Sequence, residues 1–499
     1  MTRQPSALAV YALSFVLAAC SLLYELLIAT SVSFLTGDTL VTYSVVIGLF
    51  LTWLGLGSYL SNRFAKQSLR RLIQIELLLS VLGGLSVILL HVFLITTPYF
   101  TLAWVGLTLA VATLSGFEVP LLTFLLQKHS QRSLFATVLS FDYLGGLLAS
   151  LLFPFLLIPY LGTVVTGVLI GIVNIGCAGY LLYFLKPNKT LKIATAITGT
   201  GLLLTLVFAG QVYRTLETRL YRDEVVYSTR SRYQTLTLTH QNNRTSLYLD
   251  GKIQFSSRDQ YRYHEFMSYT LLSHLPANKN NLRVGILGGG DGLLATQLRR
   301  FDDRLAEVVL VELDSVVIEL ATNNELVREL NEEVFAWEKL TVITADAFTT
   351  LQDLKNLDAV LIDFPDPQDL PTARLYSREF YTTLRQSLVP EGVFVTQATS
   401  PWSVPQAFWG IHKTIASRFT YLTPYQVTLP SFGTEWGFIA ASNAPLPETE
   451  PDTKNSRFFE SLAAHRISKD NHLSESAYDS LTVNTLDNLV LTTYYRRFE

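Results

Sequence analysis

Seven consecutive apolar runs fill the first 210 residues of this 499-residue chain, and they limit its fold more than any other feature. Each run has about 20 residues or more, the length that a helix needs to cross the hydrocarbon core of a bilayer. A large buried helical core would not require so many long runs in succession. We therefore predict a polytopic α-helical membrane domain over residues 1–211, with about seven spans near 7–29, 40–61, 72–96, 102–126, 133–158, 161–185 and 191–210. The first run lacks a small-residue cleavage site, so we expect it to be retained.

The remainder of the chain has the composition of a water-facing domain. Ten basic and five acidic residues precede position 212, whereas 28 basic and 36 acidic residues follow it. An acidic surface repels nucleic acid and favours cationic partners. Cys20 and Cys177 both lie in apolar runs, so we expect neither a disulfide framework nor a metal cluster.

The pattern of the chain changes twice after the apolar runs. Residues 212–222 are amphipathic and basic, which predicts a linker along a membrane surface. Polar and apolar residues then alternate, as in Tyr233 to Thr239, and residues 223–282 are interpreted as a small β-hairpin subdomain with a short helix after His264. Strand and helix patterns alternate from Arg283 to about Ala441, so residues 283–499 are predicted to form an α/β Rossmann-like domain of the methyltransferase type.

A glycine-rich turn begins the predicted nucleotide site. The buried-strand pattern Arg283 to Leu287 runs into Gly288 to Gly292, and glycines let a backbone turn sharply beside a ligand. The next strand ends in Glu312, which can accept hydrogen bonds from ribose hydroxyls, and a third strand ends before Asp346, which can accept from an adenine amino group. Asp291 within the turn would repel a pyrophosphate. This favours an adenosyl sulfonium compound over a dinucleotide, which stays the alternative.

Two further carboxylates follow the fourth predicted strand, Ala359 to Ile362. Asp363 and Asp366 are three residues apart in an Asp-Phe-Pro-Asp-Pro segment, which could also be a simple turn. At a strand end they would face the same crevice as Asp291, Glu312 and Asp346. So many like charges need a cation between them. A polyamine fits better than a metal, because no histidine or cysteine cluster accompanies the acids.

With these residues in place, the segment of about 223–441 resembles the spermidine synthase family of polyamine aminopropyltransferases. The order and spacing of the motifs hold over some 200 residues. The matching pieces are Tyr233-Gln234, Leu249 to Gln254, Ser257 to Asp259, Tyr263 to Glu265, Gly288 to Gly292, Val311 to Asp314, Asp346-Ala347, Asp363 to Pro367, Leu375 to Ser377, Glu379 to Tyr381, Val395 to Gln397 and Trp436 to Phe438. Leu23 to Glu25 and Gly116 to Pro120 further resemble the membrane-fused bacterial branch of that family.

The resemblance implies transfer of an aminopropyl group from decarboxylated S-adenosylmethionine, as co-substrate, to putrescine or a related amine, with no cofactor or metal. It implies three groups of site residues. Asp363 would be the catalytic base, helped by Tyr263. Nucleoside-binding positions would be Gln234, Gln254, Gly288, Gly290, Asp291, Glu312, Asp346 and Ala347. Amine-binding positions would be His264, Asp366 and Gln397.

The chain departs from soluble members of the family in ways that bear on the choice of acceptor. Phe364-Pro365 stands where soluble members have small hydroxyl residues, and Phe432 stands where many have a tyrosine that touches the amine. Gln260 replaces a common acidic residue. A homodimer is expected from the same resemblance.

Four acidic residues lie within the predicted spans, namely Glu25, Glu76, Glu118 and Asp142. Charged groups there are costly and are functional candidates by default. One hypothesis is a path or binding site for polyamine cations. The alternative is a structural role, with protonated or hydrogen-bonded carboxyls between helices.

The location of the C-terminal half stays open. Basic side chains fill the loops of Arg63 to Arg71, of Lys128 and Arg132, and of Lys186 to Lys192. By the positive-inside rule these loops face the cytoplasm of a bacterial inner membrane. Seven spans would then place the C-terminal half outside, although a cytoplasmic position suits its nucleoside substrate. Two other functions also stay open: a polyamine transporter or sensor with a non-catalytic synthase-like domain, and a methyltransferase on the same fold.

Overall fold

A computed structural model describes residues 5–36, 40–126, 133–221, 223–447, 449, 453, 456–467 and 475–496. The chain divides into two compact units, Met1–Val225 and Val226–Glu499. The predicted loop residues Asp38, Lys128, Arg132 and Arg222 lie outside the described residues.

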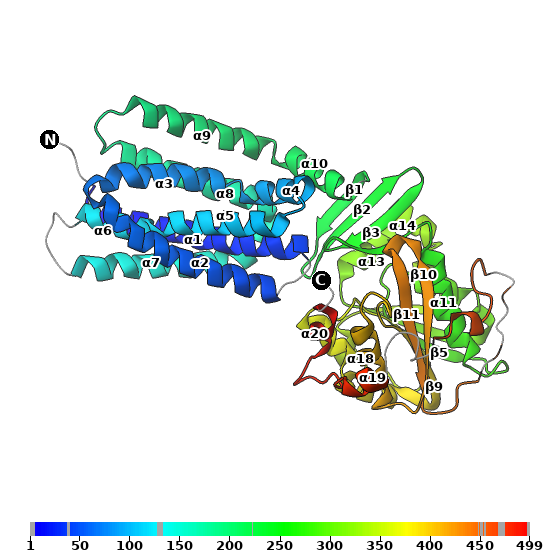
Figure 1. Ribbon diagram of the computed structural model, residues 1–499. Coiled ribbons are helices and arrows are strands. Elements are labelled where there is room, and N and C mark those ends of the chain that lie inside the picture. The colour runs from blue at the N-terminus through cyan, green and yellow to red at the C-terminus, as the bar shows by residue number, and fades with distance from the viewer. Residues whose placement is uncertain are drawn as a thin grey trace. The chain divides into compact units, whose positions relative to one another are not determined.

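The N-terminal unit is entirely helical where it is described, and its longer helices lie side by side along a common direction (Figure 1). Its elements are α1 (Ala7–Thr36), α2 (Leu40–Ser61), the 3₁₀ helix Asn62–Gln67, α3 (Ser68–Leu82), α4 (Ser86–Thr96), α5 (Phe100–Gly116), α6 (Glu118–Leu126), α7 (Ser133–Leu152), the π-helical turn Phe153–Leu157, α8 (Ile158–Leu182), α9 (Lys189–Val207) and α10 (Ala209–Tyr221).

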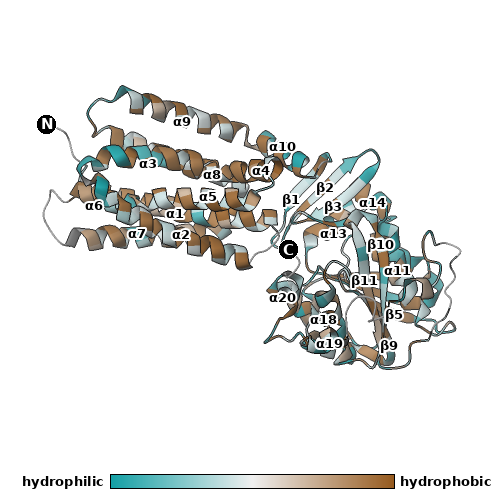
Figure 2. Ribbon diagram, in the orientation of Figure 1, coloured by the Kyte–Doolittle hydropathy of each residue, from teal (hydrophilic) through white to brown (hydrophobic). Residues whose placement is uncertain are grey.

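Hydrophobic residues predominate along the helices of this unit (Figure 2). Large apolar side chains point outward on several helices, among them Leu51, Phe155, Tyr160 and Val207, which are 60–78 % exposed. A soluble bundle of this size would leave polar residues on that face. The outer surface of the described helices is therefore more apolar than that of a typical soluble bundle.

Breaks within the helices decide how many times the unit could cross a membrane. By length and composition, five described helices could each span a bilayer, or six if α3 and α4, bent by 51° at residues 83–85, form one span. One of the five is the 48-residue stretch Phe135–Leu182, which contains two of the runs predicted from the sequence. This stretch is more than twice as long as one crossing requires, and its backbone leaves the helical region at Gly162. The number of seven spans therefore stays a prediction.

The amphipathic segment predicted at 212–222 lies within α10 as far as it is described. This helix begins at Ala209, exposes Arg214 and Arg219, and buries Leu216.

A small antiparallel sheet opens the C-terminal unit, as the period-two pattern predicts. Its four strands pair in chain order, β1 (Val225–Arg230), β2 (Thr235–Gln241), β3 (Arg244–Leu249) and β4 (Lys252–Ser256). Helix α11 (Gln260–Ser273) follows and connects this sheet to the larger one. The short helix was predicted after His264, but it begins four residues earlier, so that Tyr263 and His264 lie within its first turns.

The larger sheet has seven strands in the order β10-β11-β9-β8-β5-β6-β7. Strands β5 to β9 are parallel to one another, and β10 and β11 are antiparallel. The strands are β5 (Leu282–Gly288), β6 (Leu305–Glu312), β7 (Leu340–Thr344), β8 (Leu357–Asp363), β9 (Leu388–Gln397), β10 (Tyr421–Leu429) and β11 (Thr434–Ser442). The four strands predicted from buried apolar runs correspond to β5 to β8.

Helices cover both faces of this sheet. Successive residues of each strand point to opposite sides and so pack against different helices. Val284 and Ile286 pack with α11 and with α12 (Leu293–Arg299), whereas Leu287 packs on the other face. That second face carries α17 (Arg378–Ser387), α18 (Pro405–Ala416) and the C-terminal α20 (Leu491–Arg496). The remaining α helices are α13 (Ser315–Asn323), α14 (Glu325–Leu330), α15 (Ala347–Thr350), α16 (Leu370–Ala373) and α19 (Glu475–Ser480).

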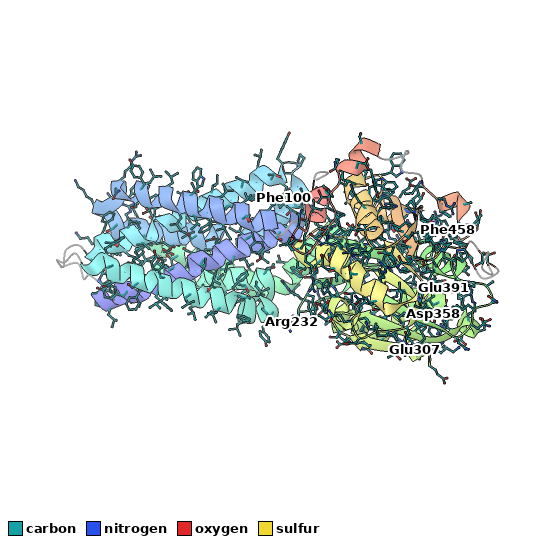
Figure 3. The ribbon with its side chains drawn as sticks, turned by 90° about the horizontal axis from the view of Figure 1, so that it is seen from below. Phe100, Arg232, Glu307, Asp358, Glu391 and Phe458 are labelled. Carbon is teal, nitrogen blue, oxygen red and sulfur yellow. The ribbon has the colours of Figure 1, made fainter. Side chains whose placement is uncertain are left out.

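The two ends of the sheet differ in their role. Glu307 and Asp358 lie near the amino ends of β6 and β8, and Glu391 near that of β9, at the far side of the unit from Arg232 (Figure 3). Two of these acids form ion pairs, Glu307 with Arg283 and Asp358 with Lys279. The carboxyl ends of the strands, where ligands bind in open α/β sheets, lie toward Arg232.

Candidate active site

The predicted site acids stand in a row at the carboxyl ends of four adjacent strands. Asp363 ends β8, Asp291 follows β5, Glu312 ends β6, and Asp346 lies two residues after β7. The strand register places Gly288 beside Asp363 and Glu312 beside Thr344. The structure therefore brings together side chains from four separate segments, as predicted from the sequence.

The turn that follows β5 is rich in glycine because its backbone lies directly against two of these acids. Gly288 has φ +83°, and a Cβ atom there would overlap the Asp363 carbonyl oxygen. A Cβ atom on Gly290 would lie 2.6 Å from Cγ of Glu312. The bare backbone at Gly290 instead donates a hydrogen bond of 3.1 Å to the Glu312 carboxylate. Gly288 and Gly290 therefore shape the site through the absence of side chains.

Glu312 is held rigidly at the end of β6. One carboxylate oxygen accepts from Gly290 N–H and the other from Asp314 N–H at 2.9 Å. Each carboxylate oxygen retains a second lone pair, which could accept from a ribose hydroxyl. Burial raises the pKa of Glu312 to about 7, against the two backbone hydrogen bonds.

Gln234 reaches the site through Asp314. Its amide donates to the Asp314 carboxylate at 3.1 Å, and the Ser231 hydroxyl donates to the same oxygen at 2.6 Å. Asp314 also caps α13 by accepting from Val316 N–H. The small sheet is thus tied to the turn after Glu312. A direct contact between Gln234 and a nucleoside stays a prediction.

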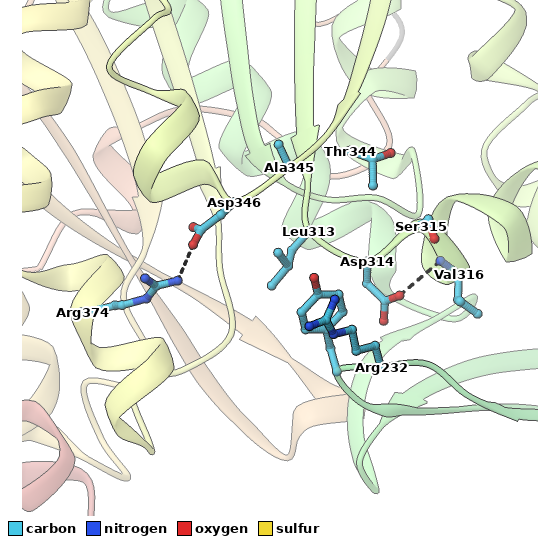
Figure 4. Close-up of a pocket in the computed structure, with 10 residues that line it drawn as sticks. Arg232, Leu313, Asp314, Ser315, Val316, Thr344, Ala345, Asp346 and Arg374 are labelled. Carbon is cyan, nitrogen blue, oxygen red and sulfur yellow. Dashed lines mark hydrogen bonds and ion pairs between the residues drawn. The ribbon is translucent and has the colours of Figure 1, made fainter. Parts of the chain in front are cut away.

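A pocket of about 570 Å³ opens beside Asp346 (Figure 4). Asp346 caps α15 and forms a 2.5 Å ion pair with Arg374, whose guanidinium lies 5.4 Å from the centre of the Phe348 ring. Ala347 is the buried first residue of α15. The sequence analysis missed Arg374, since no local motif marks an ion pair between residues 28 positions apart. The residues that line the pocket are Arg232, Tyr233, Leu313, Asp314, Ser315, Val316, Thr344, Ala345, Asp346 and Arg374.

Asp363 and Tyr263 form the centre of the row. The buried Tyr263 hydroxyl on α11 donates a short hydrogen bond to Asp363. Burial, together with the nearby Asp363 charge, raises the pKa of Tyr263 well above its ordinary value, so Tyr263 stays a donor at neutral pH. Burial raises the pKa of Asp363 to about 6, and the neighbouring Asp291 charge adds to this shift. Tyr263 can therefore hold Asp363 in position, and Asp363 can accept a proton; the predicted catalytic roles of both residues stay predictions.

Asp291 and His264 complete the surroundings of Asp363. Burial raises the pKa of Asp291 to about 6, while Leu293 N–H donates to its carboxylate at 2.9 Å. His264 is buried, and its Nδ1 lies 2.7 Å from the Gln260 carbonyl oxygen. Burial lowers the pKa of His264, so the ring is neutral at pH 7. His264 packs edge-on against Tyr263, with 5.0 Å between ring centres.

Asp366 lies at the other end of the loop from Asp363 and is hydrogen-bonded by several protein side chains. The Tyr495 hydroxyl on α20 donates to it at 2.8 Å, and the Gln397 amide lies 3.4 Å away. Burial raises the pKa of Asp366, and the nearby Lys252 charge opposes this shift. Tyr495 was missed in the sequence, because it stands 129 positions from Asp366 in a helix of six residues.

Gln397 holds the loop that carries both aspartates. Its amide nitrogen lies 2.5 Å from the Phe364 carbonyl oxygen and 2.5 Å from the Tyr376 hydroxyl. Its carbonyl oxygen accepts from Thr399 N–H and from the Trp436 indole. Since its polar atoms are engaged by protein groups, a direct role in amine binding stays a prediction.

Two of the unusual aromatic residues have structural roles. Phe364 packs edge-on against Phe380, with ring centres 5.5 Å apart, and so anchors the loop. Phe432 lies 6.5 Å from the Tyr263 ring and 4.8 Å from that of Trp436.

Gln254 lies partly buried on β4, and among the described residues no side-chain hydrogen bond of Gln254 is formed. Its predicted contact with a nucleoside stays untested.

Comparison with known proteins identifies the family. The model of the spermine/spermidine synthase domain matches residues 261–451. Over 98 % of both chains, the sequence is 36 % identical to the polyamine aminopropyltransferase of Leptospira interrogans. It is 35 % identical to that of Oceanobacillus iheyensis, over 88 % of this chain and 86 % of the relative. The spermidine synthase structure from Thermotoga maritima is 21 % identical, with a TM-score of 0.41, over 51 % of this chain and 82 % of that one. The whole-length identities show that this chain belongs to the polyamine aminopropyltransferase family.

Proposed function

We propose that the C-terminal unit transfers the aminopropyl group of decarboxylated S-adenosylmethionine to putrescine or a related amine. The products are spermidine, or a homologue, and methylthioadenosine. One observation carries the proposal: the adjacent acids Asp291, Glu312 and Asp363 form no ion pair with any basic side chain among the described residues. Two cationic substrates would supply the missing positive charge.

Each part of the two substrates is matched to the acidic side chain whose chemistry suits it. Glu312 accepts from the ribose hydroxyls, and the adenine base lies toward Asp346 and the pocket beside it. Asp291 faces the cationic chain of the sulfonium compound. The acceptor amine lies between Asp363 and Asp366. This order places the amine nitrogen near the carbon that is bonded to sulfur.

The reaction needs a neutral nitrogen, whereas a free diamine is almost fully protonated at pH 7. Asp363 accepts one ammonium proton, and its raised pKa makes it a stronger base than an exposed aspartate. The nitrogen lone pair then forms a bond to the methylene carbon beside sulfur. The carbon–sulfur bond breaks, and its electron pair stays on sulfur as the neutral thioether of methylthioadenosine. Positioning of the two cations accounts for much of the rate.

The direct test is to incubate the detergent-purified chain with decarboxylated S-adenosylmethionine and a panel of di- and polyamines. Methylthioadenosine is quantified by mass spectrometry. Amine-dependent release would support the proposal and name the acceptor. Saturable nucleoside binding without product for any amine would instead favour a sensor or transporter with a non-catalytic synthase-like domain.

The pH dependence of the proposed reaction follows from the ionisation of two carboxylates. Asp291 and Asp363 both have a pKa raised to about 6, and each must be charged to face a cation. Their charged forms are lost as the pH falls through 6. We expect kcat/KM for the nucleoside to fall about tenfold from pH 7 to pH 5.5, with a limiting slope above one, since two groups titrate together. A slope of one or less, measured in buffers of constant ionic strength, would contradict this pairing.

Tyr495 is expected to help select the amine. Its hydroxyl donates to Asp366 and replaces, at the amine end, the hydroxyl that Phe432 lacks. Tyr495→Phe should raise KM for the amine about five- to tenfold, the loss expected for one ordinary hydrogen bond, and should leave KM for the nucleoside unchanged. Tyr494→Phe is the matched control, because the Tyr494 hydroxyl on the same helix accepts from Thr482 N–H and, among the described residues, bonds to none of the predicted site residues. An equal effect of both variants would point to disordering of α20.

The N-terminal unit is proposed to be an integral part of a bacterial inner membrane, with the C-terminal unit in the cytoplasm. The outward-facing apolar side chains support the first part, and the cytosolic nucleoside supports the second. We expect the chain to resist extraction by alkaline carbonate and to dissolve in detergent. A cysteine in place of exposed Asn278 should react with an impermeant maleimide in inside-out vesicles and not in intact spheroplasts. Labelling in spheroplasts would place the enzyme outside. A homodimer stays a prediction.

A further inference from the structure

Two carboxyl side chains are enclosed in the interior of the N-terminal unit. Glu76 on α3 is 0 % exposed, and Glu118, the first residue of α6, is 3 % exposed. Among the described residues, neither carboxylate oxygen of Glu76 has a hydrogen-bond partner, and neither does Oε1 of Glu118. The other oxygen of Glu118 accepts from the Ser21 hydroxyl of α1 at 2.8 Å. Buried polar atoms in folded proteins nearly always find partners, so these three oxygens point to a group that the chain does not supply.

The packing of α3 against α8 brings a third polar side chain to the same level. A Cβ atom on Gly171 would lie 2.8 Å from the Ser80 carbonyl oxygen and 3.1 Å from Cα of Gly84, so the two helices touch there and run antiparallel. One turn before Ser80 is Glu76, and one turn after Gly171 is Asn174. Asn174 is 0 % exposed, and neither of its amide atoms has a partner among the described residues.

Electrostatic interactions link the remaining members of the cluster. Glu118 lies within range of the Glu76 charge, and Cys177 on α8 lies within range of both. The Tyr24 hydroxyl on α1 is enclosed, has no described partner and interacts with both acids. Four helices, α1, α3, α6 and α8, which are labelled in Figure 1, therefore contribute to one polar cluster inside an apolar bundle.

The other two acids predicted within spans stand apart from this cluster. Asp142 on α7 is only partly buried and lies within electrostatic range of Glu118. Glu25 on α1 is 7 % exposed and interacts with neither Glu76 nor Glu118. The structure thus selects Glu76 and Glu118 from the four candidates.

We infer that this cluster, named here the interior acid cluster (Tyr24, Glu76, Glu118 and Asn174), binds the ammonium group of an alkylamine. Two enclosed carboxyls of like charge cannot both ionise without a cation. An ammonium group supplies three N–H donors, which match the unpartnered oxygens of Glu76, Glu118 and Asn174.

A metal ion fits this cluster less well. Within the described ranges, no group of three or more histidine, cysteine or acidic side chains could hold one. Leu72, Ile73 and Leu79, within one turn of Glu76 on α3, are fully buried and suit the carbon chain of an alkylamine. The choice of an alkylamine as ligand rests on the proposed function of the C-terminal unit.

The test counts amine sites. Radiolabelled spermidine is titrated against the detergent-purified full chain by equilibrium dialysis. We expect two saturable sites per chain. Asp363→Asn with Asp366→Asn should leave one, and adding Glu76→Gln with Glu118→Gln should leave none. Glu76→Gln alone should raise the Kd of the interior site at least tenfold and leave the rate of methylthioadenosine release unchanged.

A milder variant distinguishes a loss of binding from misfolding. Tyr24→Phe removes one oxygen and keeps the ring, and it should raise the Kd of the interior site several-fold. Thr108→Val is the matched control, because the buried Thr108 hydroxyl donates to the Trp104 carbonyl of its own helix and, in the part of the chain that the structure describes, to no other group. A single site per chain, abolished by Asp363→Asn with Asp366→Asn, would overturn this inference and leave the proposed function intact. Two sites without any release of methylthioadenosine would instead overturn the proposed function alone.

Discussion

Replacement of Asp363 by asparagine is expected to lower kcat on the order of 10³-fold, within the range typical of a lost general base. Asparagine keeps the shape of the side chain and can still accept the hydrogen bond from Tyr263, but it cannot take a proton from the ammonium group. KM for the nucleoside should change little, since Glu312 and Asp346 are untouched. The measurement is the rate of methylthioadenosine release at saturating concentrations of both substrates.

Loss of folding would not explain such a result. The pKa of Asp363 is raised in the folded protein, so its ionised form opposes folding at neutral pH. That opposition is present above the folded pKa and disappears as the pH falls below the unfolded value, and an uncharged asparagine removes it at all pH values. The variant should therefore unfold at a temperature no lower than the native chain. The matched control is Asp353→Asn, an exposed aspartate in the turn before β8, which should keep full activity. If Asp363→Asn kept more than a tenth of the activity, another group or bulk water would be the base.

The row of acids could be predicted from the sequence because each member follows a parallel strand, and three of these strands, β5, β6 and β8, are largely buried on both faces. Such strands are continuous apolar runs, and parallel strands place their carboxyl ends at one edge. Glu312, Asp346 and Asp363 were therefore found from local pattern alone, and the glycine run identified the turn between them. The resemblance to a known family assigned roles that this pattern could not.

Contacts between distant segments could not be predicted in the same way. Tyr495 with Asp366, and Arg374 with Asp346, join residues that no shared motif links. The start of α11 was misjudged for a similar reason. Asp259 precedes the helix as a typical capping residue, yet its carboxylate accepts from Ser431 N–H at 2.7 Å and does not cap the helix. A tertiary contact thus uses the group that would have signalled the boundary.

In the helical unit, prediction from the sequence is limited for a different reason. Hydropathy measures the length of an apolar run, whereas a crossing also depends on where the helix bends. The bend between α3 and α4 and the non-helical Gly162 lie inside runs that read as continuous. The same apolar background concealed the pairing of Glu76 with Glu118, since only packing shows which helix faces meet.

The second large effect is expected from a single methyl group in the glycine turn. Gly290→Ala would place a Cβ atom 2.6 Å from Cγ and 2.8 Å from a carboxylate oxygen of Glu312. The Glu312 side chain would have to move, which would break its hydrogen bond from Gly290 N–H and displace the proposed acceptor of the ribose hydroxyls. We expect KM for the nucleoside to rise on the order of a hundredfold, near the upper end for a lost hydrogen bond to a charged group. KM for the amine should change little.

The control for this variant is available in the preceding strand. Gly285→Ala meets only the ends of the Leu357 and Val360 side chains, at 3.3 Å or more, and it lies away from the site. It should leave both KM values unchanged. Isothermal titration with methylthioadenosine separates the two explanations of a high KM, because this product carries the ribose and lacks the aminopropyl chain. If Gly290→Ala weakened methylthioadenosine binding as much as it raised KM, Glu312 would be acting on the ribose. Unchanged methylthioadenosine binding would show that the turn instead positions Asp291 against the cationic chain, and the assignment of Glu312 would be wrong.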